Sequence, residues 1–441
     1  MSRATNSVTA LLLGVLMPAA LSAQLGSFNP RPGPQGTFAI RNAHIFPVSG
    51  PEIVSGTIVI SGGKITAIGA GASVPNGATV IDATGLSVYP GMTESANSLG
   101  LAEITEGANA TVDNVEVGRL NPNMQAFFGF DPHSAYVGTT RFMGITQVVT
   151  APSGGLISGQ AAVMGLAGDT PPQMVIRQHA AMVINLPGGG RGGRGGGGFG
   201  AAAPAPASTT ASTDSIKQIL RDADAYGKAL DAWDKDKTLP RPGHDVVLAV
   251  LVPVVRGEMP ALFPAEAVAD IRAAVTFAEE MKIKPIIVGG RDAWRVADFL
   301  KQHDVPVIVT GVMSLPARED DPYDVNYAAP AKLAAAGVRF AIASGEPNPD
   351  LRNLPEVAGM AAAFGLSKDD ALKSVTLWPA QIFGLGDRLG SLEVGKTANL
   401  VVTDGYLLEA RTNTRYLFID GRQVPLDNKA TTLYNEFKDR P

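Results

Sequence analysis

Residues 58–69 read IVISGGKITAIG, and this run predicts a β-hairpin because two apolar segments flank the turn residues Ser61-Gly62-Gly63. Further β-type segments lie nearby, at residues 38–45 and 79–82. A matching β region returns at the far end of the chain, at residues 400–403 and 416–419. We therefore expect the two ends of the chain to build one small sheet domain around a large insertion.

The insertion, residues 89–388, alternates strand-like and helix-like segments, which is typical of βα units. Short apolar runs predict buried parallel strands at residues 146–150, 284–288, 305–310 and 339–343. Helix patterns lie between them, at residues 265–281, 294–302 and 327–336. The expected fold class is α/β, with a TIM-type (β/α)8 barrel, a closure that takes about 250 residues.

The composition excludes several classes of function. The 441 residues carry 36 Lys and Arg against 41 Asp and Glu, so the net charge is −5 and no basic footprint for nucleic acid is present. The chain has no cysteine, which excludes disulfides, thiolate metal sites and a cysteine nucleophile. Only five histidines can serve as metal ligands or bases: His44, His133, His179, His244 and His303.

The N-terminal residues 1–23 read as a signal peptide. Arg3 supplies the positive start, and residues 11–21 form an apolar run too short to span a bilayer. No later stretch is apolar over the length of a membrane span. We therefore expect a secreted protein, periplasmic or extracellular, without a membrane span.

A Gly-, Ala- and Pro-rich insertion at residues 188–213 interrupts the barrel pattern. It has too little apolar area to offset its ordering entropy, so we expect a flexible surface loop. The expected division of the remaining chain is a composite β-sandwich from residues 24–88 and 389–425, the barrel from residues 89–388, and a C-terminal tail at residues 426–441.

Motifs near both ends and in the middle of the chain resemble the amidohydrolase superfamily, in its secreted imidazolonepropionase-like branch. Besides residues 58–69, they read VIDATG at 80–85, VYPGM at 88–92, GITQVV at 144–149, ALKSVTLWPA at 371–380 and GSLEVGKTANLVV at 390–402. The resemblance implies a metal-dependent hydrolase barrel with a composite β-sandwich, which agrees with the fold expected from the patterns alone.

The resemblance also implies a divalent metal centre, with an H-x-H motif after the first strand, histidines after two later strands and an aspartate after the last. Such a cation would lower the pKa of bound water and polarise a substrate carbonyl. In this sequence the expected ligand positions hold Ala96, Ser98, Pro264, Gly289 and Gly345. None of these offers an imidazole or a carboxylate, so the sequence predicts a member whose usual metal site is lost.

A rebuilt, carboxylate-rich site is the alternative, and its weak candidates are Glu94, Asp131, His133 and Glu346. Glu94 stands where the family has an aspartate before the H-x-H motif, and Glu346 follows the expected aspartate position. The ordinary interpretation is that these are loop acids facing water, with Asp131 and His133 in a turn that leads into a helix.

Two segments at the expected open end of the barrel are candidates for ligand binding. The glycine-rich residues 152–160 follow a predicted strand, and Arg318 begins an acidic segment after another. The candidate residues in the first segment are Ser153, Gly154, Gly155, Ser158 and Gln160. A structural turn, and a cap for the following helix, are the alternatives.

The sequence favours a secreted, amidohydrolase-like protein without catalysis, either a ligand-binding protein or a partner of an active relative or of a second copy. In this hypothesis no cofactor is expected. The alternative is a hydrolase of carbon–nitrogen bonds other than peptide bonds, acting through the rebuilt carboxylate site with a divalent metal such as Zn.

Overall fold

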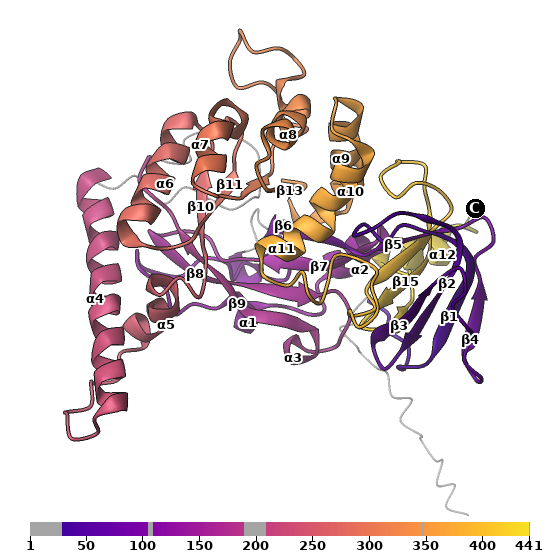
Figure 1. Ribbon diagram of the computed structural model, residues 1–441, viewed down its shortest axis with the longest axis horizontal. Helices are drawn as coiled ribbons and strands as arrows, with labels where there is room; N and C mark the ends of the chain where they lie inside the picture. The colour runs from indigo at the N-terminus through magenta and orange to yellow at the C-terminus, as the bar shows by residue number, and fades with distance from the viewer. Residues whose placement is uncertain (1–28, 105–108, 189–208, 346, 441) are drawn as a thin grey trace, which may run out of the picture.

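The computed structural model describes residues 29–104, 109–188, 209–345 and 347–440, which form two eight-stranded sheets (Figure 1). Both ends of the chain supply the first sheet, with strand order β16-β15-β14-β5-β1-β2-β3 and β4 paired to β1. Its strands are β1 (Phe38–Ile45), β2 (Ile53–Ser61), β3 (Lys64–Gly69), β4 (Thr79–Asp82), β5 (Ser87–Pro90), β14 (Leu400–Thr403), β15 (Thr414–Ile419) and β16 (Arg422–Val424).

The predicted hairpin connects β2 to β3. Gly62 and Gly63 form its two-residue turn with φ of +57° and +79°, a left-handed pair that favours glycine. The composite domain is confirmed as well, because β14 pairs antiparallel with β5 and so joins the two chain ends. This sheet has a hydrophobic core of its own, which includes Ile40, Ile58 and Phe418.

The second sheet forms a nearly closed barrel in the order β13-β12-β11-β10-β9-β8-β7-β6. Its strands are β6 (Met92–Asn97), β7 (Ile145–Thr150), β8 (Ile157–Gly165), β9 (Val175–Ile184), β10 (Ala261–Ala265), β11 (Pro285–Gly289), β12 (Val307–Val309) and β13 (Phe340–Ile342). The predicted barrel is confirmed, with one departure from regular βα alternation: β8 runs antiparallel to both β7 and β9. The other pairs in the barrel are parallel.

Helices surround the barrel, most visibly along the side formed by α4, α6, α7 and α8 in Figure 1. The helices are α1 (Ala126–Gly129), α2 (Ala135–Phe142), α3 (Pro171–Met174), α4 (Thr209–Lys235), α5 (Val246–Val255), α6 (Val268–Met281), α7 (Ala297–Gln302), α8 (Val325–Ala336), α9 (Leu354–Ala363), α10 (Lys368–Val375), α11 (Leu377–Ile382) and α12 (Lys429–Phe437). Short 3-10 turns lie at Asn109–Thr111, Ala293–Val296 and Asn348–Asn353. None of the helices within the described residues is both long and apolar enough to span a membrane.

The barrel interior is packed with apolar side chains. Small and branched residues from the strands fill it, among them Val149, Leu262 and Ile308. Phe383 and Leu389 come from the segment after α11 and join the same cluster. Thr93, at the start of β6, lines the same small cavity as Phe383 and Leu389. These two residues therefore close the end of the barrel at which β6 begins. Only about 10 Å³ of free space remains there.

Pro171–Met174 forms α3 and β9 begins at Val175, so His179 lies within β9. One local prediction was wrong. The insertion expected at residues 188–213 ends earlier than predicted, because α4 begins at Thr209. Residues 189–208 of that insertion, and the expected signal peptide at residues 1–23, lie outside the described residues, so both remain predictions.

Candidate functional site

The first two expected metal-ligand positions are built into the wall of the barrel. Ala96 is buried at the end of β6 and packs in the interior cluster with Ala343. The Ser98 hydroxyl donates to Asn348 Oδ1 at 3.3 Å. In return, Asn348 Nδ2 donates to the carbonyl oxygens of Ser98, at 3.1 Å, and Ala102, at 2.7 Å. Both positions therefore serve packing and hydrogen bonding across the barrel.

At Gly289, a carboxylate fills the space that a histidine side chain would need. Gly289 ends β11 with φ of +100°, and a Cβ atom there would lie 2.3 Å from Glu266 Oε1. The Glu266 carboxylate accepts a hydrogen bond from the Arg291 N–H at 3.0 Å. Burial raises the pKa of Glu266, and the hydrogen bond and charge of Arg291 oppose this rise. The neighbouring position, Pro264 in β10, offers no ligand atom at all.

At Gly345, the backbone itself excludes the expected aspartate. This residue follows β13 with φ of +69°, and a Cβ atom would lie 1.7 Å from the carbonyl oxygen of Thr310. A contact below about 3 Å to a backbone atom forces the chain to move, and the left-handed φ adds further strain. Only glycine fits this position as the chain now runs.

Glu94 lies on β6 with no exposed area. Its Oε2 accepts a hydrogen bond from the Ser344 N–H at 2.9 Å, and its Oε1 accepts one from the Ala96 N–H at 3.3 Å. Since β6 and β13 are the two ends of the barrel sheet, this carboxylate joins the strands across the seam. Burial raises the pKa of Glu94 to about 7, although its hydrogen bonds act in the opposite direction.

The other candidates for a rebuilt site do not join Glu94. Asp131 and His133 lie on the exposed turn before α2, where Asp131 Oδ1 accepts the His133 N–H at 2.8 Å. The neighbouring Ser134 caps α2 by accepting the Tyr136 N–H, so this is the predicted turn into a helix. Glu346 lies outside the described residues. Across the described chain, no three His, Asp or Glu side chains gather as a metal-binding group.

The glycine-rich segment is mostly buried and satisfies its own polar groups. The predicted loop ends early, because Ser158 and Gln160 belong to β8. The Ser158 hydroxyl donates to the carbonyl of Gly154 at 2.7 Å. A Cβ atom on Gly155, whose φ is +65°, would lie 2.9 Å from the carbonyl of Arg119. Ser153 is also buried, and its N–H donates to the carbonyl of Asn114. A ligand role for this segment stays a prediction.

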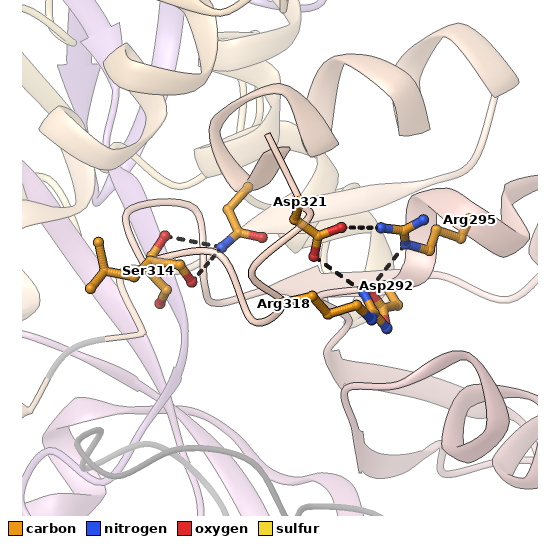
Figure 2. Close-up of polar contacts among 7 residues, drawn as sticks. Asp292, Arg295, Ser314, Arg318 and Asp321 are labelled. Atoms are coloured by element: carbon orange, nitrogen blue, oxygen red, sulfur yellow. Dashed lines mark hydrogen bonds and ion pairs between the residues drawn. The ribbon is translucent and has the colours of Figure 1, made fainter. Parts of the chain in front are cut away.

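Arg318 belongs to an ion-pair network that anchors the loop between β12 and α8 (Figure 2). Its guanidinium makes a two-pronged contact with Asp292, at 2.6 and 3.1 Å, and also reaches Asp321 at 3.3 Å. Arg295 completes the network by contacting the other oxygen of Asp321 at 2.5 Å. Burial raises the pKa of Asp292, but the hydrogen bond and charge of Arg318 outweigh it and lower this pKa overall.

The residues at the family's metal positions therefore do not fit a divalent cation. Four of the five positions lack any side-chain ligand atom, since they hold alanine, glycine or proline, and the Glu266 carboxylate fills the space beside Gly289. The sequence analysis did not identify Glu266, which fills the space beside Gly289, or Asn348, which forms hydrogen bonds with Ser98. Glu266 lies close to Pro264 in sequence, but Asn348 is 250 residues from Ser98, so no local pattern could have paired them.

Comparisons with known proteins agree with this fold. Residues 271–424 match the model of the amidohydrolase family. An 84-residue segment is 39% identical to the imidazolonepropionase of Syntrophobacter fumaroxidans; it covers 18% of this chain and spans only a fifth, 20%, of that relative.

Two solved structures illustrate the likeness. An amidohydrolase from Thermotoga maritima superimposes with a TM-score of 0.77 at 24% identity, covering 88% of this chain and 99% of that one. An adenosine deaminase from Xanthomonas campestris, solved with bound zinc, gives 0.50 at 15% identity, covering 93% and 99%. At these identities the structures show the fold alone. Residues 271–424 thus match the amidohydrolase family model, and most of the chain shares its fold with these solved structures.

Proposed function

We propose that this chain is a non-catalytic member of the superfamily, which acts by binding a partner or a ligand and not by metal-assisted hydrolysis. The observation that carries the proposal is the backbone at Gly345, where the carbonyl of Thr310 occupies the place of any side chain. The occupied space at Gly289 supports it independently. Losing a ligand side chain alone could be compensated nearby, but at Gly345 the backbone also leaves no room for one.

The alternative, a rebuilt site for hydrolysis of carbon–nitrogen bonds, receives little support from Glu94. Its carboxylate is fully buried and both oxygens accept backbone hydrogen bonds. A metal-bound or general-base carboxylate needs access to water and substrate. Asp131 and His133 are accessible, but the Asp131 carboxylate is committed to its turn.

A partner role at the barrel mouth is supported by the loop between β12 and α8, which projects from the top of the molecule in Figure 1. Leu315 is 84% exposed and Tyr323 75% exposed, while Arg318 and Asp321 anchor the loop between them. A rigid loop that presents exposed leucine and tyrosine loses little conformational entropy when a partner covers it. We propose that the partner is an active relative or a second copy, and that the protein is secreted.

Metal content tests this proposal directly. The mature protein, purified without a histidine tag, is incubated with excess Zn²⁺ or Mn²⁺, desalted and measured by elemental analysis. We expect less than about a tenth of an equivalent of metal per chain, because the usual ligand positions offer no ligand side chains. An intact metal site of this family's type would keep its ion through desalting. The matched control is Glu94→Gln treated in the same way. Stoichiometric metal in the wild type that Glu94→Gln loses would refute the proposal and support the rebuilt site.

A further inference from the structure

A surface depression of about 220 Å³ lies away from the barrel, between α4 and the connection that leads to α5. In Figure 1 this connection hangs from the lower end of α4. The lining residues are Tyr226, Leu230, Arg241, Pro242 and His244. Neither the family resemblance nor the proposed function uses this region, so a ligand site here would be independent of both.

The walls of the depression are held in place by contacts on both sides. Tyr226 and Leu230 are four residues apart on α4, so they share one face of the helix. The Tyr226 hydroxyl accepts a hydrogen bond from the Asp245 N–H at 3.4 Å, which ties the connection back to α4. Arg256, after α5, contacts Asp231 on α4 at 2.7 Å. These contacts fix the two helices relative to each other.

Two basic side chains in the depression, Arg241 and His244, make no ion pair with the described residues. The guanidinium of Arg241 stacks over the ring of Trp233, with Cζ 4.8 Å from the ring centre, and it makes no ion pair with the described residues. His244 is exposed and likewise makes no ion pair with the described part of the chain. The contact with Trp233 holds the guanidinium beside the ring, and a cation–π contact of this kind does not use up the N–H donors.

The nearby carboxylates are already engaged elsewhere. Asp231 pairs with Arg256, and Asp234 contacts Lys237 at 2.7 Å. The Asp245 carboxylate caps α5 by accepting the Leu248 N–H at 3.0 Å. None of these carboxylates forms an ion pair with Arg241, so its guanidinium is open to an anion that enters the depression.

We propose that this depression binds a small aromatic carboxylate. Arg241 recognises the carboxylate group, because its planar fork of N–H donors matches two carboxylate oxygens. Leu230, Pro242 and the ring of Tyr226 cover the apolar body of the ligand. The combination of one fixed cation with apolar walls selects against both a bare inorganic anion and a neutral aromatic molecule.

The test uses the full mature chain labelled with 5-fluorotryptophan, titrated with benzoate and followed by ¹⁹F NMR. The three tryptophans are Trp233, Trp294 and Trp378, and single Trp→Phe variants assign their signals. We expect benzoate to shift the Trp233 signal saturably and to leave the other two unchanged. Benzamide, the neutral analogue, and inorganic phosphate, which has no apolar body, should each bind at least tenfold more weakly.

Arg241→Gln should weaken benzoate binding at least tenfold, because a charge-assisted two-pronged contact is lost. Arg221→Gln, an exposed arginine on α4 outside the depression, is the matched control and should bind as the wild type does. The proposal is overturned if benzoate does not shift Trp233, if benzamide or phosphate shifts it with the same affinity, or if the two arginine variants respond alike.

Discussion

Replacing Glu94 with glutamine should remove a large part of the pH dependence of stability. In the folded chain, burial raises the pKa of Glu94 from 4.5 to about 7. The folded state therefore holds the proton more tightly than the unfolded state does. The stabilising contribution of the protonated group is fully present below pH 4.5 and is lost as the pH rises through about 7.

The magnitude follows from the same shift. Each pKa unit corresponds to about 1.4 kcal/mol, so the contribution of Glu94 to the free energy of unfolding falls by on the order of 3 kcal/mol across this window. The groups that lower the pKa of Glu94 are hydrogen bonds from Ser344, Ser95 and Ala96, and burial outweighs them. Glutamine has nearly the same shape and cannot ionise. The wild type should thus lose stability relative to Glu94→Gln between pH 5 and pH 8.

The assay is urea unfolding of both proteins at several pH values, followed by far-UV circular dichroism. The other buried acids whose pKa is raised, such as Glu266, titrate in both proteins and cancel in the difference. Glu258→Gln, at an exposed position, is the control and should follow the wild type at every pH. Parallel curves for the wild type and Glu94→Gln would refute the reasoning, because they would mean that Glu94 titrates alike in both states.

Three further substitutions test the closed site and the anchored loop by the same unfolding measurement. Gly345→Asp should cost about 3 kcal/mol or more, because of its φ of +69° and the clash with Thr310, and elemental analysis should find no gain of metal. Asn348→Ala should cost about 2 kcal/mol, since two buried carbonyls lose their donor. Asp292→Asn should cost about 2 kcal/mol, because Arg318 keeps its charge beside a buried neutral amide; a wild-type-like value would contradict the proposed anchoring.

Local sequence signals were sufficient for the elements whose ends are fixed by their own residues. Ser367 caps α10 by accepting the Asp370 N–H, and Gly337 ends α8 with φ of +74°, so residue types typical of helix caps mark both ends. The strands β1, β4 and β14 have the predicted bounds. In each case a turn or cap residue lies beside a clear apolar pattern. The local sequence therefore sets the boundary of the element, and tertiary contacts do not shift it.

The parts that sequence reasoning missed depend on distant contacts. The early start of β8 within a glycine-rich run is set by its pairing with β9 and by the contact of Gly155 with Arg119. The bond between Glu94 and Ser344 spans 250 residues. Such contacts form only when the barrel closes. The sequence could therefore identify which ligands are absent, but it could not show what had taken their place.

What has taken their place decides how firmly the usual metal ligands are excluded from these positions. A lost histidine on an otherwise unchanged strand can be restored by one substitution. Gly289 and Gly345 instead have left-handed φ values, and in both cases other atoms occupy the direction in which a side chain would point. Restoring a metal centre would require moving the ends of β11 and β13, and moving β13 would break the hydrogen bond between Ser344 and Glu94. The closed seam and a metal site at these positions are thus alternatives, since the same backbone cannot hold both.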